Sequence, residues 1–324
     1  MNYYLGVDGG GTKTKFIISD EQGMILAIST QPTCHYLQCG FDGITNVMRT
    51  GLNECLKKSG IKEQDIASAF IACAGYGDIE KDNKRIQEAV QKAYPTIPHI
   101  IGNDTENALA GSLAGGYGIN VIAGTGSIGL GKNEHQVMLR CGGWHHSFGG
   151  DEGSAYWIAC KLILHFTRQS DGREERTELY DYIKKEYQLK EDSDILDFCV
   201  VQWDFDRTKI AAMSRSVYEL AKRQDPIAIA IFKEAAKELA DIIRTIYRKL
   251  NFTSSTVPVS YSGGVFQSKH FILDPLRQEL SSLPSLQLCE PVLSPDSGSI
   301  ILAMQQNHLT ITPAILHNLL ITNQ

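Results

Sequence analysis

The sequence has 324 residues, of which 43% are hydrophobic and 21% are charged, and its formal net charge is −6 at pH 7. This length allows two domains with cores of their own. The lack of basic runs argues against nucleic acid as the main partner, and no apolar run is long enough to predict a membrane span. The chain begins with a predicted strand rather than a signal peptide, so we expect a cytoplasmic protein.

Eight cysteines are spread along the chain, and none of them forms a C-x-x-C pair. Most lie in apolar segments, which predicts reduced thiols that pack as small hydrophobic side chains. Cys34 and Cys39, with His35 between them, are too few ligands for a metal centre. We therefore expect no structural metal.

The N-terminal segment predicts two antiparallel strands joined by a glycine turn. The turn consists of Gly9, Gly10, Gly11, Thr12, Lys13 and Thr14. Successive glycines let backbone N–H groups point into one concavity, and the two threonines add hydroxyl donors. Asp8 precedes the turn, where it could hold a hydrated Mg²⁺. We interpret the segment as a phosphate loop; the alternative is a glycine-rich hairpin without a ligand.

This loop does not fit a Walker loop or a Rossmann turn, because a strand rather than a helix follows it. It resembles the first phosphate loop of the superfamily of sugar kinases, actin and heat-shock ATPases. Strands and helices then alternate: strands at 24–28, 67–74 and 99–104, and helices at 43–59, 81–94 and 105–111. The alternation predicts a mostly parallel α/β sheet preceded by a meander.

Asp104 ends the last of these strands, at the sheet edge where open α/β sheets bind ligands. It has the position of a base that accepts the proton of a hydroxyl group. The alternative is that Asp104 caps the following helix.

The opening design recurs after residues 115–118, where we place a domain boundary. Residues 119–123 and 128–131 predict two strands, and Gly124, Thr125, Gly126 and Ser127 form the turn between them. Two such hairpins indicate an internal repeat. If the two turns face each other across a cleft, they could hold a triphosphate from both sides.

The rest of the chain is mostly helical. We expect helices at 153–166, 177–187, 209–223, 226–250 and 299–306, strands at 256–260 and 286–289, and a C-terminal segment at 313–321. These elements predict a first domain at 1–116 and a second at 117–304 with a helical insertion. The C-terminal segment 305–324 could pack back on the first domain.

A glycine-rich loop from Cys141 to Ser154 precedes the first of these helices. Its carboxylates, Asp151 and Glu152, could accept hydrogen bonds from vicinal sugar hydroxyls, and Trp144 could stack on a sugar ring. The alternative is that the acidic residues interact with the helix N-terminus. His145 and His146 lack further ligands nearby, so we expect a hydrogen-bonding or structural role for them.

The motifs D-G-G-G-T-K-T, N-D, G-T-G-S, C-G-G-W and G-D-E-G-S-A-Y-W, in this order, resemble those of the N-acetylglucosamine kinases of the BadF/BadG/BcrA/BcrD ATPase family. The resemblance covers nearly the whole chain. It implies an α/β fold of two actin-like (ribonuclease H-like) ATPase domains with an interdomain cleft. It also implies ATP and Mg²⁺ as cofactors, a homodimer, and phosphorylation of the 6-hydroxyl of an amino sugar in amino-sugar or cell-wall sugar recycling.

The resemblance also assigns residues to each substrate. Asp104 is implied as the base, and sugar contacts are implied for Cys34, His35, Asp104, Thr125, Gly143, Trp144 and Asp151. Ser262, Gly263 and Gly264 are expected to border the adenosine, next to the phosphate-binding turns.

The acceptor is expected to be N-acetylglucosamine, with N-acetylmuramate and glucosamine as alternatives. The N-acetylglucosamine kinases are expected to carry an asparagine where this chain has Cys34, and one residue fewer between Trp144 and Asp151. The rival function is an ATPase activator of a 2-hydroxyacyl-CoA dehydratase, which needs cysteines that hold an iron–sulfur cluster. Cys141 and Cys160 are poorly placed for this.

Overall fold

The computed structural model describes residues 2–323, which form two compact units. Unit 1 combines the N-terminal segment up to Gly118 with the segment that begins at Glu290, and unit 2 is Ile119–Cys289. The boundary at residue 304 predicted from the sequence differs from this division. Residues 290–304 belong to unit 1, because α11 (Pro295–Gln306) packs against its sheet.

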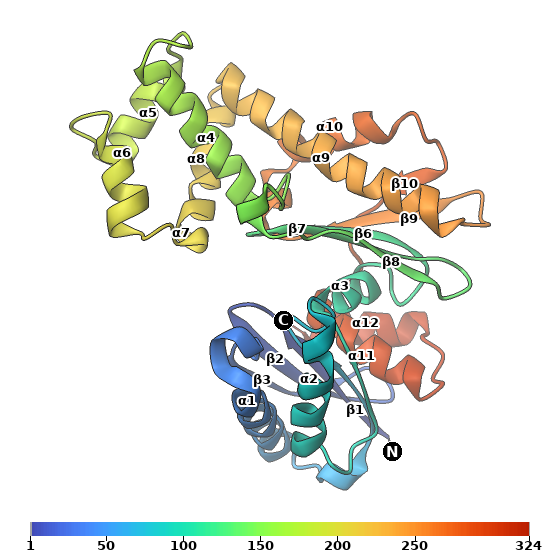
Figure 1. The fold of residues 1–324 in the computed structure, drawn as a ribbon. Helices are drawn as coiled ribbons and strands as arrows, with labels where there is room; N and C mark the ends of the chain where they lie inside the picture. Colours follow the sequence, from blue (N-terminus) through green and yellow to red (C-terminus); the bar gives the residue numbers. More distant parts are fainter. Residues whose placement is uncertain (1, 324) are drawn as a thin grey trace. The chain divides into compact units, whose positions relative to one another are not determined.

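The sheet of unit 1 has five strands: β1 (Tyr3–Gly9), β2 (Lys13–Asp20), β3 (Ile25–Pro32), β4 (Ile66–Ala72) and β5 (His99–Gly102) (Figure 1). Their order is β3-β2-β1-β4-β5, with β1, β2 and β3 antiparallel and β4 and β5 parallel to β1. The meander and the parallel strands occur as predicted. Asp8 lies opposite Lys15 on β2 and opposite Ala72 on β4.

Both faces of this sheet are covered. On one face, α1 (Tyr36–Ser59) and α2 (Glu80–Ala93) enclose a core that includes Phe16. On the other, α3 (Asp104–Ser112), α11 and α12 (Pro313–Thr322) enclose a core that includes Ile17. Phe16 and Ile17 enter different cores because successive side chains of a strand point to opposite faces. A short 3₁₀ turn, η1 (Glu63–Asp65), precedes β4.

The sheet of unit 2 repeats this topology. Its strands are β6 (Gly118–Ala123), β7 (Ser127–Lys132), β8 (Met138–Gly142), β9 (Val257–Ser262) and β10 (Leu286–Leu288). Their order is β10-β9-β6-β7-β8, which from the other end has the connectivity of unit 1. The two sheets therefore carry the internal repeat that the two hairpins predicted, and they confirm the α/β class.

The helices of unit 2 enclose one large core. They are α4 (Ala155–Ser170), α5 (Glu178–Glu186), α6 (Asp194–Leu196), α7 (Arg207–Ala212), α8 (Ser214–Lys222), α9 (Pro226–Leu250) and α10 (His270–Leu280) (Figure 1). The 3₁₀ turns η2 (His146–Phe148) and η4 (Gly264–Ser268) and the π-helical turn η3 (Asp197–Gln202) complete it. Asp225 caps α9 by accepting hydrogen bonds from Ile227 N and Ala228 N, and Pro226 fits the first helical position.

Several elements differ from the sequence prediction, among them α6 and η3, for which the sequence predicted no element, and α1, which begins earlier than expected. The helix expected at 209–223 is divided into α7 and α8 near Met213. Strand β8 is half exposed and lacks a clear apolar alternation, and α10 contains Pro275, so neither was predicted. No helix within residues 2–323 is both long enough and apolar enough to cross a membrane.

Candidate active site

The turn between β1 and β2 presents backbone donors. Gly10 N donates to Lys13 O at 2.9 Å, Thr33 Oγ1 donates to Gly10 O at 2.8 Å, and Gln38 Nε2 donates to Gly11 O at 2.9 Å. In a trans peptide the N–H points opposite to the C=O, so the N–H groups of Gly11 and Thr12 point away from these side chains. Within residues 2–323, no hydrogen bond takes up either N–H. Two neighbouring, exposed donors of this kind suit an anion.

Gly9 and Thr14 of the predicted loop are packed against neighbouring residues of unit 1. A Cβ on Gly9 would lie 2.5 Å from both Ala72 O and Cys34 Sγ, so this position has no room for a side chain. Thr14 is fully buried, and its Oγ1 accepts a hydrogen bond from Cys34 N at 3.0 Å. Thr14 therefore anchors the segment after β3, and its predicted role as an exposed hydroxyl donor is corrected.

Asp8 is a shielded carboxylate at the end of β1. Asn107 Nδ2 donates to Asp8 Oδ1 at 2.8 Å and to Val7 O at 3.1 Å. Burial raises the pKa of Asp8 to about 6, against the lowering effect of Asn107; Asp296 raises the pKa further and Lys15 lowers it. Asn107 Oδ1 is buried and accepts no hydrogen bond from the described residues.

The oxygens around Asp8 fit a hydrated Mg²⁺. This ion keeps several waters and takes only one or two carboxylates beside substrate phosphates. Residues 2–323 contain no group of three or more His, Cys, Asp or Glu side chains placed to hold a metal on their own. The Asp8 carboxylate and the buried Asn107 oxygen therefore suit an ion that arrives with its waters and phosphates.

Asp104 is the first residue of α3, directly after β5. The N-cap is Asn103, whose Oδ1 accepts from Thr105 N at 3.1 Å, and Glu106 Oε1 accepts from Asn103 N at 3.0 Å. Asn103 and Glu106 thus form a capping box, so the alternative role predicted for Asp104 belongs to its neighbour. Asp104 shares a helix face with Asn107, three residues on, which binds Asp8.

The segment after β3 does not present Cys34 to a ligand. The Cys34 side chain is 0% exposed, and a hydrogen bond with the Cys73 thiol lowers its pKa to about 7. The predicted sugar contact of Cys34 is therefore wrong for its side chain, because the thiol packs in the core. His35 is half-buried and caps α1 by accepting from Leu37 N through Nδ1, and burial lowers the pKa of its ring.

The turn between β6 and β7 is built like the first one. Its carbonyls are held by the N-terminus of α4: Ala155 N donates to Gly124 O at 2.9 Å, and Tyr156 N donates to Thr125 O at 3.4 Å. By the same peptide geometry, the N–H groups of Thr125 and Gly126 point the other way. Among the described residues, nothing accepts a hydrogen bond from them.

An ion pair between Asp151 and Arg207 packs against Gly126 of this second turn. Asp151, in a left-handed conformation at φ 63° and 5% exposed, accepts from Ser127 N through Oδ1 at 3.1 Å. Its Oδ2 pairs with Arg207 Nη2 at 2.5 Å. A Cβ on Gly126 would collide with both Arg207 and Asp151. Asp151, predicted as a sugar ligand, is therefore buried, and both its oxygens bind groups within unit 2.

The loop before Asp151 exposes aromatic surface. Trp144 is 76% exposed and follows Gly143, which has a φ of 72°. His145 caps η2 by accepting from Ser147 N, and the ring of His146 lies 4.1 Å from that of His145. The exposed indole remains available for stacking, whereas the two histidines contribute to the structure of the loop.

A cavity of about 610 Å³ opens beside the second turn, within unit 2. Its wall combines Gly124 and Thr125 with apolar side chains such as Phe232 and polar ones such as Arg215. The full lining is Gly124, Thr125, Ala155, Ile158, Thr208, Ala211, Ala212, Ser214, Arg215, Tyr218, Glu219, Phe232, Gly264, Val265, Gln267 and Ser268. This volume and mixed lining are typical of a small-molecule site.

Three residues were predicted to border adenosine. Gly264 lines this cavity, whereas Ser262 and Gly263 are not in its wall. Ser262 instead donates from Oγ to Asn120 Oδ1 at 3.2 Å within the sheet. Gly263 has a φ of 101°, and a Cβ there would collide with Ala123 O, so it allows the chain to turn tightly from β9 into η4.

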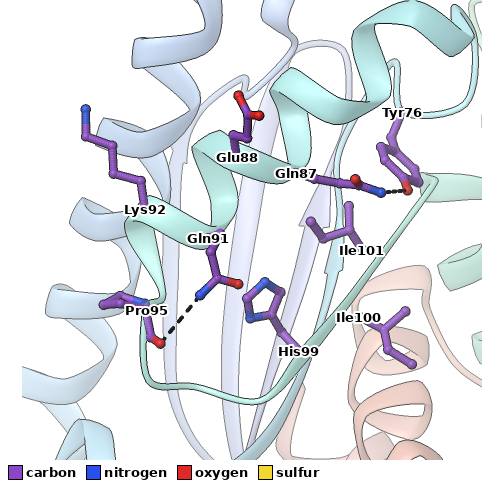
Figure 2. Close-up of a pocket in the computed structure, with 9 residues that line it drawn as sticks. All are labelled: Tyr76, Gln87, Glu88, Gln91, Lys92, Pro95, His99, Ile100 and Ile101. Carbon is purple, nitrogen blue, oxygen red and sulfur yellow. Dashed lines mark hydrogen bonds between the residues drawn. The ribbon is translucent and has the colours of Figure 1, made fainter.

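Unit 1 has a hollow of about 800 Å³ along α2 and the edge strand β5 (Figure 2). Tyr76, Gln87, Glu88, Gln91, Lys92, Pro95, His99, Ile100 and Ile101 line it. Gln87 donates to the Tyr76 hydroxyl at 2.8 Å across it. None of the predicted site residues lies in its wall, so we do not assign it to the site.

Both turns occur in a repeated five-stranded topology. The sequence matches the BadF/BadG/BcrA/BcrD ATPase family over residues 5–282. The chain belongs to this family. It is 29% identical over 313 residues to N-acetyl-D-glucosamine kinase of Dictyostelium discoideum, covering 93% of this chain and 97% of that protein. It is also 29% identical over 307 residues to N-acetylmuramic acid/N-acetylglucosamine kinase of Clostridium acetobutylicum, covering 94% and 99%.

The fold has solved relatives as well. A crystal structure of a candidate N-acetylglucosamine kinase from Porphyromonas gingivalis superposes with a TM-score of 0.69 at 21% identity, covering 95% of this chain and 100% of that one. At this identity the likeness establishes the fold. The chain thus has the two-domain α/β fold of actin-like ATPases.

Sequence reasoning missed four residues around the two turns: Lys15, Asn107, Arg207 and Asp296. Lys15 and Asp296 form an ion pair beside Asp8, and Arg207 pairs with Asp151. Each partner is remote in sequence, so no local spacing could reveal these contacts.

Proposed function

We propose that this protein is an ATP-dependent kinase that phosphorylates the 6-hydroxyl of an amino sugar, with N-acetylglucosamine as the preferred acceptor. The observation that carries this is the second turn, whose outward N–H groups adjoin a cavity of nucleoside size. Relatives of nearly equal length are N-acetylglucosamine kinases. The same proposal includes a cytoplasmic location, a homodimer, and N-acetylmuramate or glucosamine as further acceptors.

Backbone groups and side chains have separate roles in the proposed reaction. The N–H groups of the two turns bind phosphate oxygens, and the cavity binds the adenosine. Asp104 accepts the proton of the sugar hydroxyl as that oxygen attacks the γ-phosphorus, and the bond from this phosphorus to the β,γ-bridging oxygen breaks to release ADP. Trp144 stacks on the sugar ring, and Gly143, Thr125 and His35 supply further contacts. Asp8 and the nearby Asn107 oxygen would hold a hydrated Mg²⁺, which neutralises phosphate charge when bound.

The deciding experiment is a comparison of ADP release from Mg·ATP with different acceptors. N-acetylglucosamine, N-acetylmuramate, glucosamine and glucose are each compared with a blank without sugar. We expect strong stimulation by N-acetylglucosamine, with or without a response to N-acetylmuramate. A rate that no sugar changes would contradict the proposal and point to an ATPase activator, to be pursued by an assay for iron and for a protein partner.

The nucleotide cavity can be tested by filling it. A Cβ on Gly264 has no heavy atom within 4 Å, and Gly264 does not have a positive φ. Gly264→Val should therefore leave the unfolding temperature near that of the wild type but place two methyl groups at the cavity wall. We expect the KM for ATP to rise by about tenfold or more, with the KM for the sugar little changed, which steady-state kinetics measures. An unchanged KM for ATP would place the adenosine elsewhere.

A further inference from the structure

The amide of Asn323 joins the C-terminal segment to β2 and to the start of α11. Its Oδ1 accepts a hydrogen bond from Lys15 Nζ at 3.0 Å, and its Nδ2 lies 3.0 Å from Asp296 Oδ2. Nδ2 also lies 3.0 Å from Ser294 Oγ and 2.8 Å from Ser297 Oγ. Both ends of one amide are therefore engaged by residues more than 25 positions away in the chain.

Asn323 completes an ion pair that is largely shielded from water. Lys15 Nζ pairs with Asp296 Oδ2, and the two side chains are 26% and 9% exposed. A shielded pair is stable only when further hydrogen bonds satisfy its remaining donors and acceptors. Asn323 supplies one such bond to each partner.

Lys15 has a second carboxylate within reach. In the register of β1 and β2 it lies opposite Asp8, and directly opposed residues have Cβ atoms only about 4.5–5.5 Å apart. The flexible ammonium group could pair with either Asp8 or Asp296. The hydrogen bonds of Asn323 favour Asp296, because they bind both members of that pair.

We propose that Asn323 is a positioning residue of the nucleotide site, which holds the Lys15 ammonium at Asp296 and so leaves the Asp8 carboxylate open to a hydrated divalent cation. This inference rests on the proposed use of Mg·ATP. Loss of the amide removes one acceptor from Lys15 and one donor from Asp296. The ammonium is then free to pair with Asp8, where it competes with the cation.

The test uses Mn²⁺ as the probe, because free Mn²⁺ can be counted by electron paramagnetic resonance. Full-length protein is titrated with Mn²⁺ in the presence of saturating ADP. We expect Asn323→Ala to weaken Mn²⁺ binding by about tenfold, the size typical of changes to the partners of a metal ligand. The matched control is Asn318→Ala on α12, the helix that Asn323 follows; it removes only a surface hydrogen bond to Gln22 O and should bind as the wild type does.

A double-mutant cycle separates positioning from general stability. In a Lys15→Gln background, Asn323→Ala should cause almost no further loss, because Asn323 acts through the Lys15 ammonium. An equal loss in both backgrounds, or wild-type Mn²⁺ affinity in Asn323→Ala, would overturn the inference. If the wild type itself binds neither Mn²⁺ nor ADP, the proposed function fails; if it binds both and Asn323→Ala is unchanged, only this inference fails.

Discussion

Asp104→Asn is expected to keep the fold and the affinity for ADP but to lose roughly 10²- to 10⁴-fold in kcat, the usual contribution of a general base. The substitution removes the proton acceptor while preserving the shape of the side chain. The cap of α3 should be unaffected, because Asn103 and Glu106 form it. The measurement combines sugar-dependent ADP release with calorimetric titration of ADP.

Glu106→Gln provides the control for Asp104→Asn. It lies two residues further along the same helix and removes a neighbouring carboxylate while keeping the capping box, because a glutamine at this position can also accept from Asn103 N. Both the unfolding temperature and kcat should therefore stay close to those of the wild type. A near-normal kcat in Asp104→Asn would remove Asp104 as the base.

Arg207→Gln is expected to destabilise unit 2 by about 3 kcal/mol, the lower end of the cost of leaving a buried charge without its partner. We take the lower end because the Arg207 side chain is 35% exposed whereas that of Asp151 is 7% exposed. The contact of the ion pair with Gly126 is lost at the same time, so the affinity for ADP should also fall. Chemical unfolding and calorimetric titration measure the two effects.

The double variant Asp151→Asn, Arg207→Gln tests whether the unpaired Asp151 charge causes the loss of stability. Asparagine tolerates the left-handed conformation of residue 151, so the backbone is preserved while the unpaired charge disappears. We expect most of the lost stability to return. If Arg207→Gln alone is as stable as the wild type, or if the double variant is no better than Arg207→Gln, the ion pair does not act as a brace.

The regular elements were predictable because their signals are local. Pro226 after a capping Asp225, together with a stripe of apolar residues, predicts α9, and the structure has the same bounds. The two glycine turns follow strands of strong β-propensity, so their hairpins and the repeat could be predicted as well. Asp104 was predicted as the last residue of a strand, and the structure places it just beyond β5, as the first residue of α3.

The partners within the site were not predictable, because they depend on tertiary contacts. Lys15 and Asn323 are 308 positions apart, and Asp151 and Arg207 are 56 apart. Cys34 was predicted as a sugar contact because the family resemblance implied one for its loop. That segment packs against Thr14 and Gly9, which buries the thiol. Spacing indicates which residues share an element, but not which way a loop residue turns.

The division of unit 1 into two chain segments has a consequence for synthesis. Tyr4, Ile17 and Phe70 leave the ribosome early, yet the helix that covers them, α11, is translated only after all of unit 2. At about 5–20 residues per second, this apolar surface of the nascent chain is exposed to water for roughly ten seconds or more. We expect unit 2 to complete its folding first, and chaperone dependence or aggregation during expression to originate in the uncovered face of the N-terminal sheet.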